Sequence, residues 1–142
     1  MSIAESFFAY AQAFEKTFED DDWSRLRKFF TLDAVYLPGD GQEICGRQEL
    51  LDHLRTSLDT FDRLFDSRRV ELISQPVVTS SQLTIQWKAT YEKNGLPDLV
   101  LVGSEVATFE EHAISRLEDV ISDGVADALK KWTSDHGERL AE

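Results

Sequence analysis

Two acidic residues, Glu105 and Asp119, are spaced so that they can face each other across a hairpin. The apolar strand that carries Glu105 is predicted to end near Phe109, and Glu111-His112-Ala113 is predicted to turn the chain. A turn centred there pairs Glu105 directly with Asp119, with Cβ atoms about 4.5–5.5 Å apart. Two carboxyl groups this close in apolar surroundings cannot both ionise easily, so an acid then stands beside a base near neutral pH. The pair is therefore a candidate for proton transfer.

Two other interpretations of this pair stay open. A shift of one residue in the strand register would turn an acid outward, because it reverses the face of every side chain. An ion pair with an arginine would give the acids a purely structural role, and the candidate arginines are Arg47, Arg68, Arg69 and Arg116.

Other residue types that often do chemistry lack the partners they need. Cys45 has no neighbouring Cys or His for a metal site, and we expect a partly buried, inert thiol. A single cysteine cannot form an internal disulfide, which fits a reducing compartment. His53, His112 and His136 show no metal-binding spacing and are expected to be exposed, although His53 could face a pocket. No GxSxG, P-loop or GxGxxG motif is present, so we expect no metal, no cofactor and no serine-hydrolase or nucleotide chemistry.

The charge and hydropathy of the chain argue against nucleic acids and membranes as binding partners. The 142 residues carry a formal charge of −12 with no basic stripe, so nucleic acids and anionic membrane surfaces would be repelled. The first ten residues, MSIAESFFAY, do not resemble a signal peptide, and no stretch approaches the roughly 20 apolar residues of a membrane span. We expect a cytoplasmic protein that binds neither nucleic acid nor membrane.

Helical spacing dominates the first part of the chain. Apolar residues recur every three and four positions from Ile3 to Phe18, and Ser2 with Glu5 can form a capping box. The segment from Thr31 to Asp33 is expected to break the second helix, and the cluster Pro38-Gly39-Asp40-Gly41 to form a turn. The predicted elements are a helix over 3–19, a short helix opening at Asp22 or Ser24, strands over 34–37 and 42–45, and a long helix over 47–61.

From Ser67 onward the apolar period changes from 3.6 to 2. The clearest alternation puts Leu83, Ile85, Trp87, Ala89 and Tyr91 on one face of a strand. Asn94-Gly95 predicts a hairpin turn. The next strand, 99–109, is apolar on both faces and is expected to be covered on both sides. A last strand over 114–121 and a helix capped by Ser122 or Asp123 follow, the helix carrying Val125, Leu129, Trp132 and Leu140.

Helices and strands are segregated along the chain, which is typical of an α+β fold. We expect one domain over residues 1–142, with a core over about 5–123 and a C-terminal helical extension over 123–142. This order of elements resembles the nuclear transport factor 2-like superfamily, in its SnoaL-like and ketosteroid-isomerase-like branch. Four local phrases carry the resemblance: Asp20-Asp21-Asp22-Trp23 with Leu26 and Phe30, the strand Leu32 to Tyr36, the turn and helix start Ile44 to Leu51, and the hairpin Glu105 to Phe109 with Leu117 to Asp119.

The resemblance implies a cone, a cystatin-like α+β roll. A strongly curved, mixed or antiparallel sheet wraps around the long helix, a C-terminal helix follows, and a small-molecule pocket opens on the concave face. It also implies that Phe109 points inward, and by alternation so does Glu105. Glu105 matches an inward acid that donates to an oxyanion in ketosteroid-isomerase-like proteins. Asp119 matches an acid in the last strand of epoxide-hydrolase-like and SnoaL-like proteins.

Apolar and aromatic residues are expected to bind the ligand, although each could instead be an ordinary core residue. These are Tyr10, Phe14, Tyr36, Trp87, Tyr91, Leu101 and Leu117.

Several positions depart from the known enzymes of the family. Phe14 stands where ketosteroid isomerases have a tyrosine, and Pro38 stands where they have an aspartate base, with Asp40 two residues on. Trp87 and Ala89 replace the Arg and Asp of the epoxide-hydrolase set. Steroid isomerisation and epoxide hydrolysis by those sets are therefore not expected. The remaining hypotheses are cofactor-free acid–base catalysis (isomerase, hydrolase or lyase type) on a small, mostly apolar molecule, or a non-catalytic ligand-binding or dimerisation module.

The resemblance also implies a homodimer through the convex sheet face, where Val100, Val102 and Val106 would lie. The alternative is that the final helix covers this face within one chain.

Overall fold

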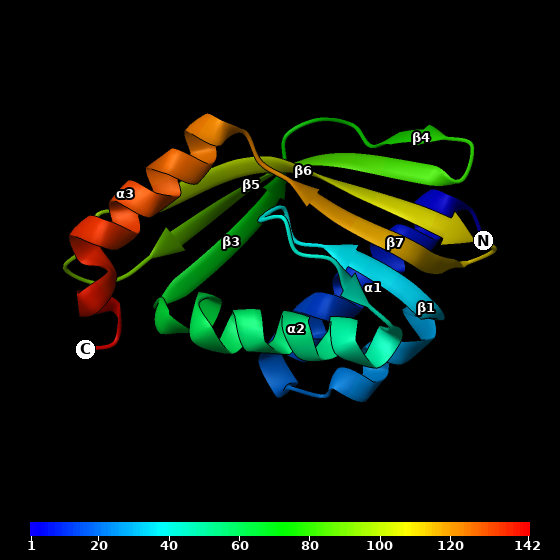
Figure 1. Ribbon diagram of the computed structural model, residues 1–142, viewed down its shortest axis with the longest axis horizontal. Coiled ribbons are helices and arrows are strands. Elements are labelled where there is room, and N and C mark those ends of the chain that lie inside the picture. Colours follow the sequence, from blue (N-terminus) through cyan, green and yellow to red (C-terminus); the bar gives the residue numbers. More distant parts are fainter.

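Seven strands form one curved sheet, and helices cover its concave side (Figure 1). The computed structural model describes all 142 residues. The sheet order is β2-β1-β7-β6-β5-β3, with β4 paired to β5 outside this path, and only β1 and β7 run parallel. The strands are β1 (Phe30–Leu37), β2 (Ile44–Cys45), β3 (Ser67–Leu72), β4 (Val77–Thr79), β5 (Gln82–Glu92), β6 (Leu99–Glu110) and β7 (Ala113–Val120). The predicted α+β class and curved sheet are confirmed.

The first two α-helices form as their sequences predict. α1 (Ile3–Asp20) begins at a capping box, in which the Glu5 amide donates to Ser2 Oγ at 3.1 Å and the Ser2 amide donates to Glu5 Oε1 at 3.4 Å. α2 (Arg47–Thr60) buries a stripe of leucines against the sheet. That stripe is Leu50, Leu51, Leu54 and Leu58.

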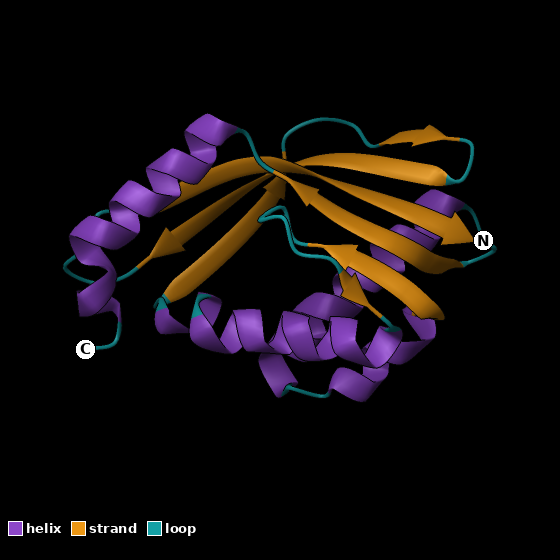
Figure 2. Cartoon of the chain, viewed as in Figure 1, coloured by secondary structure: helices purple, strands orange, loops and turns teal.

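The third helix, α3 (Asp123–Leu140), begins at the predicted cap Ser122, whose Oγ accepts from the Val125 amide at 3.2 Å. Trp132 and Leu140 pack in one apolar cluster with Ala89 and Leu101, two residues that line the concave side of the sheet. The helix therefore lies along one end of the concave side (Figure 2). The alternative that this helix covers the convex face is wrong.

The convex face of β6 stays open. Val100 is 48% exposed and Val102 is 41% exposed, while Val106 is half-buried. The expectation that β6 is covered on both faces is therefore wrong for its first residues. Both faces of β6 are apolar in sequence, but only the face that carries the odd-numbered residues packs against the helices.

Four further elements differ from the sequence prediction. β1 begins at Phe30 rather than at Ala34, because the expected break at 31–33 is an irregularity within the strand. The register against β7 shifts between Phe30 and Val35. The short second helix is a 3₁₀-helix, η1 (Trp23–Phe29), and a one-turn helix, η2 (Asp62–Leu64), follows α2. β4 was not predicted, since three exposed residues show no alternation.

No helix of the structure is long and apolar enough to cross a membrane.

Candidate active site

The predicted pairing of the two acids is confirmed, because Glu105 on β6 lies directly opposite Asp119 on β7. The turn itself is Glu111-His112, with Glu111 at φ 58° and Glu110 paired with Ala113. A regular ladder from that turn would place Glu118 opposite Glu105. The register shifts by one between Thr108 and Phe109, which leaves Ser115 as the extra residue on β7. This bulge is what brings Asp119 into the pair.

Both acids line a cavity of about 760 Å³ between the concave sheet face and the helices α1 and α2. That volume lies within the usual range of small-molecule sites. All residues predicted to bind a ligand also line this cavity, and their role in binding stays a prediction. They are Tyr10, Phe14, Tyr36, Trp87, Tyr91, Leu101 and Leu117.

The environment of Glu105 favours its protonated form. Burial, the charge of Asp119 and a hydrogen bond with Asp119 raise the pKa of Glu105 well above its usual range. The residue is only half-buried, but it belongs to the cavity wall, so the surface that it exposes faces the cavity. We therefore expect Glu105 to be protonated beside Asp119 near neutral pH.

No arginine forms an ion pair with either acid, so the structural ion-pair interpretation is wrong. Arg68 pairs with Glu15 and Asp62, and Arg69 pairs with Glu71 and Glu92. Arg116 pairs with Glu118, and Arg47 lies against the backbone oxygens of Arg27 and Phe30.

Tyr36 orients Asp119 through a hydrogen bond that the sequence analysis did not predict. Its hydroxyl donates to Asp119 Oδ2 at 2.6 Å. Burial and the charge of Asp119 raise the pKa of Tyr36, so the phenol stays protonated and continues to donate. The contact depends on the parallel pairing of β1 with β7, where Tyr36 lies opposite Leu117. Strands that are distant in sequence make this pairing, so no local pattern predicts it.

Tyr10 brings a hydroxyl to the cavity from α1, one helical turn before Phe14. The residue is 5% exposed, and its hydroxyl forms no hydrogen bond within the protein. Burial, followed by the charges of Glu105 and Asp119, raises the pKa of Tyr10, so the phenol stays protonated in the cavity wall that it shares with the two acids. Tyr10 therefore offers a free donor near the acid pair.

A second polar group lies at the β3 side of the cavity. Arg68 Nε donates to Asp62 Oδ2 at 2.8 Å, and Nη1 donates to Glu15 at 3.0 and 3.1 Å. The Tyr91 hydroxyl lies 3.5 Å from Asp62 Oδ2. Burial raises the pKa of Asp62, and Arg68 opposes that rise. Sequence reasoning placed Tyr91 in the wall but did not assign Arg68 and Asp62 to it.

Gly103 allows Trp87 to lie flat against the sheet. The two residues are directly paired across β5 and β6. A Cβ at Gly103 would lie 2.6 Å from Trp87 Cζ2 and 2.7 Å from the Val120 carbonyl oxygen, distances that only a glycine avoids. An isolated glycine within a strand is the sequence feature that indicates such a close approach.

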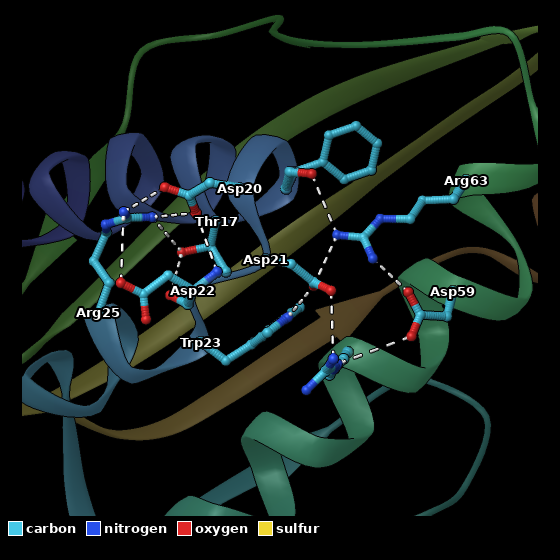
Figure 3. A network of polar contacts seen from close by, with 10 residues as sticks. Thr17, Asp20, Asp21, Asp22, Trp23, Arg25, Asp59 and Arg63 are labelled. Carbon is cyan, nitrogen blue, oxygen red and sulfur yellow. Dashed lines mark hydrogen bonds and ion pairs between the residues drawn. The ribbon is translucent and has the colours of Figure 1, made fainter.

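The acidic turn after α1 lies outside the cavity and joins α1 to α2 (Figure 3). Arg25 forms a two-pronged ion pair with Asp20, at 2.9 and 2.6 Å, and its hydrogen bond lowers the pKa of Asp20. Arg63 reaches from η2, just after α2, to Asp21 at 3.1 Å and also pairs with Asp59 on α2. No group of three or more His, Cys, Asp or Glu side chains is arranged to hold a metal ion. The ion pairs of Asp21 with Arg55 and Arg63 hold the end of α1 to α2 and η2.

The cysteine and the histidines lie away from the cavity wall. Cys45 is exposed rather than partly buried. His112 is exposed in the hairpin turn, as expected. His53 and His136 are half-buried instead, because each packs against an aromatic ring, that of Tyr36 and that of Trp132 respectively.

No family model matches this chain, and no curated protein matches it in sequence. Solved structures match its fold. An NTF2-like protein of unknown function from Burkholderia pseudomallei is 14% identical, with a TM-score of 0.67 over 92% of this chain and 97% of that one. An LEH-like epoxide hydrolase from M. tuberculosis is 12% identical, with a TM-score of 0.64 over 92% and 93%. TerC, co-crystallised with polyporic acid, is 11% identical, with a TM-score of 0.67 over 91% and 98%.

Further matches at similar levels include a SnoaL-like polyketide cyclase, a ketosteroid isomerase-like fold and a cystatin fold. Identities this low establish the architecture and leave the chemistry to the site. The chain has the nuclear transport factor 2-like fold that its sequence resembles.

Proposed function

We propose that this protein binds a small, mostly apolar molecule in its cavity and that Glu105 and Asp119 transfer a proton to and from it without a cofactor. The observation that supports this is the direct pairing of two carboxyl groups in the cavity wall, where neither forms an ion pair with a cationic side chain. Such a pair keeps a proton donor and a proton acceptor side by side.

The surroundings assign different roles to the two acids. Asp119, which accepts a hydrogen bond from Tyr36, is the base. Glu105, whose pKa is raised by burial and by Asp119, stays protonated and donates to an oxygen of the ligand. In a carbonyl compound, Asp119 takes a proton from the neighbouring carbon, and the C–H electron pair moves into an enolate that Glu105 stabilises. Returning the proton to another carbon gives an isomer.

The base can be tested with 5-nitrobenzisoxazole, which reports removal of a proton from carbon. The base takes the proton, the C–H electrons form a nitrile, and the N–O bond breaks to give a coloured phenolate. We expect Asp119→Asn to lower kcat/KM for this probe about 100-fold. Glu118→Gln is the matched control, because Glu118 is the neighbouring acid on the other face of β7 and pairs with Arg116. Equal activity of Asp119→Asn and the wild type would rule out this base.

A non-catalytic binding protein is the second candidate. It is favoured by Phe14, Pro38 and Trp87, which replace the catalytic residues of the better-known enzymes and line the cavity here. This candidate predicts a ligand that co-purifies from cells and is seen by native mass spectrometry. It also predicts that Asp119→Asn retains this ligand unchanged. A ligand that the wild type converts and Asp119→Asn does not convert would exclude it.

We also propose that two copies pair through the convex sheet face. Val100 and Val102, exposed on the same face of β6, support this, because large exposed apolar residues in a row are often covered by a partner. Sedimentation velocity is expected to show a dimer that Val102→Arg dissociates. Wild-type protein that sediments as a monomer would contradict the proposal.

A further inference from the structure

The cavity is elongated and has a polar group at each end. On β5, Glu105 lies opposite Ile85 and Arg68 lies opposite Tyr91, six residues further along the strand. Six residues of a strand span about 20 Å, and the long side chains at both ends shorten this span. The wall between them is apolar, formed by Trp87, Ala89 and Leu101 among others.

Arg68 keeps donors that the protein does not use. Its Nε and Nη1 atoms donate to Asp62 and Glu15, whereas Nη2 forms no hydrogen bond at normal geometry. Tyr91 lies close to the guanidinium, but Nη2 carries two N–H groups. The fully buried polar atoms without a partner are Ser6 Oγ, Arg47 Nε and Thr90 Oγ1. Nη2 is not among these fully buried atoms, so it is partly exposed. Because Arg68 lines the cavity, the free donors of Nη2 can meet a ligand there.

The charges around Arg68 restrict what it can bind. Two carboxylates, Asp62 and Glu15, already balance the guanidinium, so this end carries no surplus positive charge. The other end holds Glu105 and Asp119. A carboxylate ligand would be repelled at both ends, whereas a neutral carbonyl oxygen can accept from Nη2.

We propose that the ligand is a neutral, elongated molecule with a hydrogen-bonding oxygen at each end, and that Arg68 determines specificity by donating from Nη2 to a carbonyl oxygen at one end. The other oxygen lies near Glu105, Asp119 and Tyr10. This inference rests on the proposed function in that it takes the same cavity to be the binding site.

Three rigid probes separate the contributions of the two ends: 6-acetyl-2-naphthol, 6-ethyl-2-naphthol and 6-hydroxy-2-naphthoic acid. They share the hydroxyl end and differ only where Arg68 would bind. Isothermal titration calorimetry at pH 7 is expected to show that the wild type prefers the ketone over the ethyl compound about tenfold and binds the acid more weakly than the ketone.

Variants of Arg68 test whether this residue causes the preference for the ketone. Arg68→Met combined with Asp62→Asn removes the guanidinium and the buried charge together, and Arg68→Lys keeps the charge without the fork of donors. Both are expected to bind the ketone and the ethyl compound with similar affinity. Arg116→Met, a change at an exposed arginine outside the cavity wall, should keep the preference.

A preference for the ketone that persists in both Arg68 variants would overturn the proposal, and so would tight binding of the acid or no binding of any probe. Glu105→Gln is expected to weaken the ketone and the ethyl compound alike and to keep the ratio between them. The proton-transfer proposal fails separately, through the Asp119→Asn assay, even if the ketone preference follows Arg68.

Discussion

Carboxyl groups lie at both ends of the cavity, and the two ends neutralise them by different means. At the β3 end, Asp62 is 14% exposed and pairs with Arg68 at 2.8 Å, so a fixed cation balances its charge. At the β6–β7 end, Glu105 and Asp119 have only each other and Tyr36. A fixed cation stays in place, whereas the proton on Glu105 can leave. The first arrangement suits binding, and the second suits proton transfer.

The largest expected effect of a single substitution is at the ion-paired end. Arg68→Met leaves Asp62 buried without its cation and should lower the free energy of unfolding by about 3–5 kcal/mol. Urea denaturation followed by tryptophan fluorescence measures this. Arg69→Met is the control, because its side chain is 60% exposed and its ion pairs are long, so it should cost less than about 1 kcal/mol. Equal losses of unfolding free energy in the two variants would show that the buried Arg68–Asp62 pair stabilises the fold no more than the exposed pairs of Arg69.

The carboxyl pair should appear in the pH dependence of stability. The folded-state pKa of Glu105 is raised, so the folded protein holds this proton more tightly than the unfolded chain does. Its contribution is therefore most favourable below the unfolded-state pKa of about 4.3. It is lost as pH rises toward the folded-state pKa, by at most about 1.4 kcal/mol per pH unit.

Glu105→Gln should remove this slope. Between pH 4 and pH 7 the variant should therefore lose less stability than the wild type. Denaturation curves measured between pH 4 and 8 test this, with Glu118→Gln as the control on the outer face. Parallel profiles for the wild type and Glu105→Gln would mean that Glu105 titrates normally.

Two tyrosines compare the hydrogen bonds at the two ends. Tyr36 donates to Asp119 at 2.6 Å, and its replacement by Phe should cost about 1.5–3 kcal/mol. The Tyr91 hydroxyl lies 3.5 Å from Asp62, at the limit of a hydrogen bond, so Tyr91→Phe should cost about 0.5 kcal/mol or less. Thermal unfolding of both variants gives the comparison. The interpretation of Tyr36 fails if Tyr91→Phe is the more damaging change.

Tyr10→Phe should have the smallest effect on stability, within about 0.5 kcal/mol, because its hydroxyl has no partner in the protein. The same change should lower the affinity for 6-acetyl-2-naphthol about three- to tenfold, because a hydrogen bond to the ligand is lost. Calorimetry and thermal unfolding measure the two quantities separately. Loss of stability without loss of affinity would mean that the hydroxyl serves the fold.

The sequence predicts well the features that depend on short stretches of chain. The alternation from Leu83 to Tyr91 and the pairing of Glu105 with Asp119 lie within one strand and one hairpin, where period and turn position determine the result. The contact from Tyr36 to Asp119 joins residues 83 apart, and the contact from Arg68 to Glu15 joins residues 53 apart. Both depend on how distant elements pack, and amino-acid patterns carry little information about that.

The bulge at Ser115 shows a second limit. The prediction placed a three-residue turn at 111–113 and reached the correct acid pair, whereas the structure reaches the same pair through a two-residue turn and one extra residue on β7. Both routes give the same register from Thr108 onward, and sequence spacing alone does not distinguish them.

The position of the acid pair also bears on how this protein can evolve. Glu105 and Asp119 lie on two interior strands of the sheet, where ladder hydrogen bonds on both sides determine their spacing. Arg68 lies on the edge strand β3, which has a partner on one side only. Substitutions at that edge can change which molecule enters while the paired acids keep their geometry. Ligand choice and proton chemistry can therefore diverge independently, so descendants of this chain could acquire new substrates without rebuilding the acid pair.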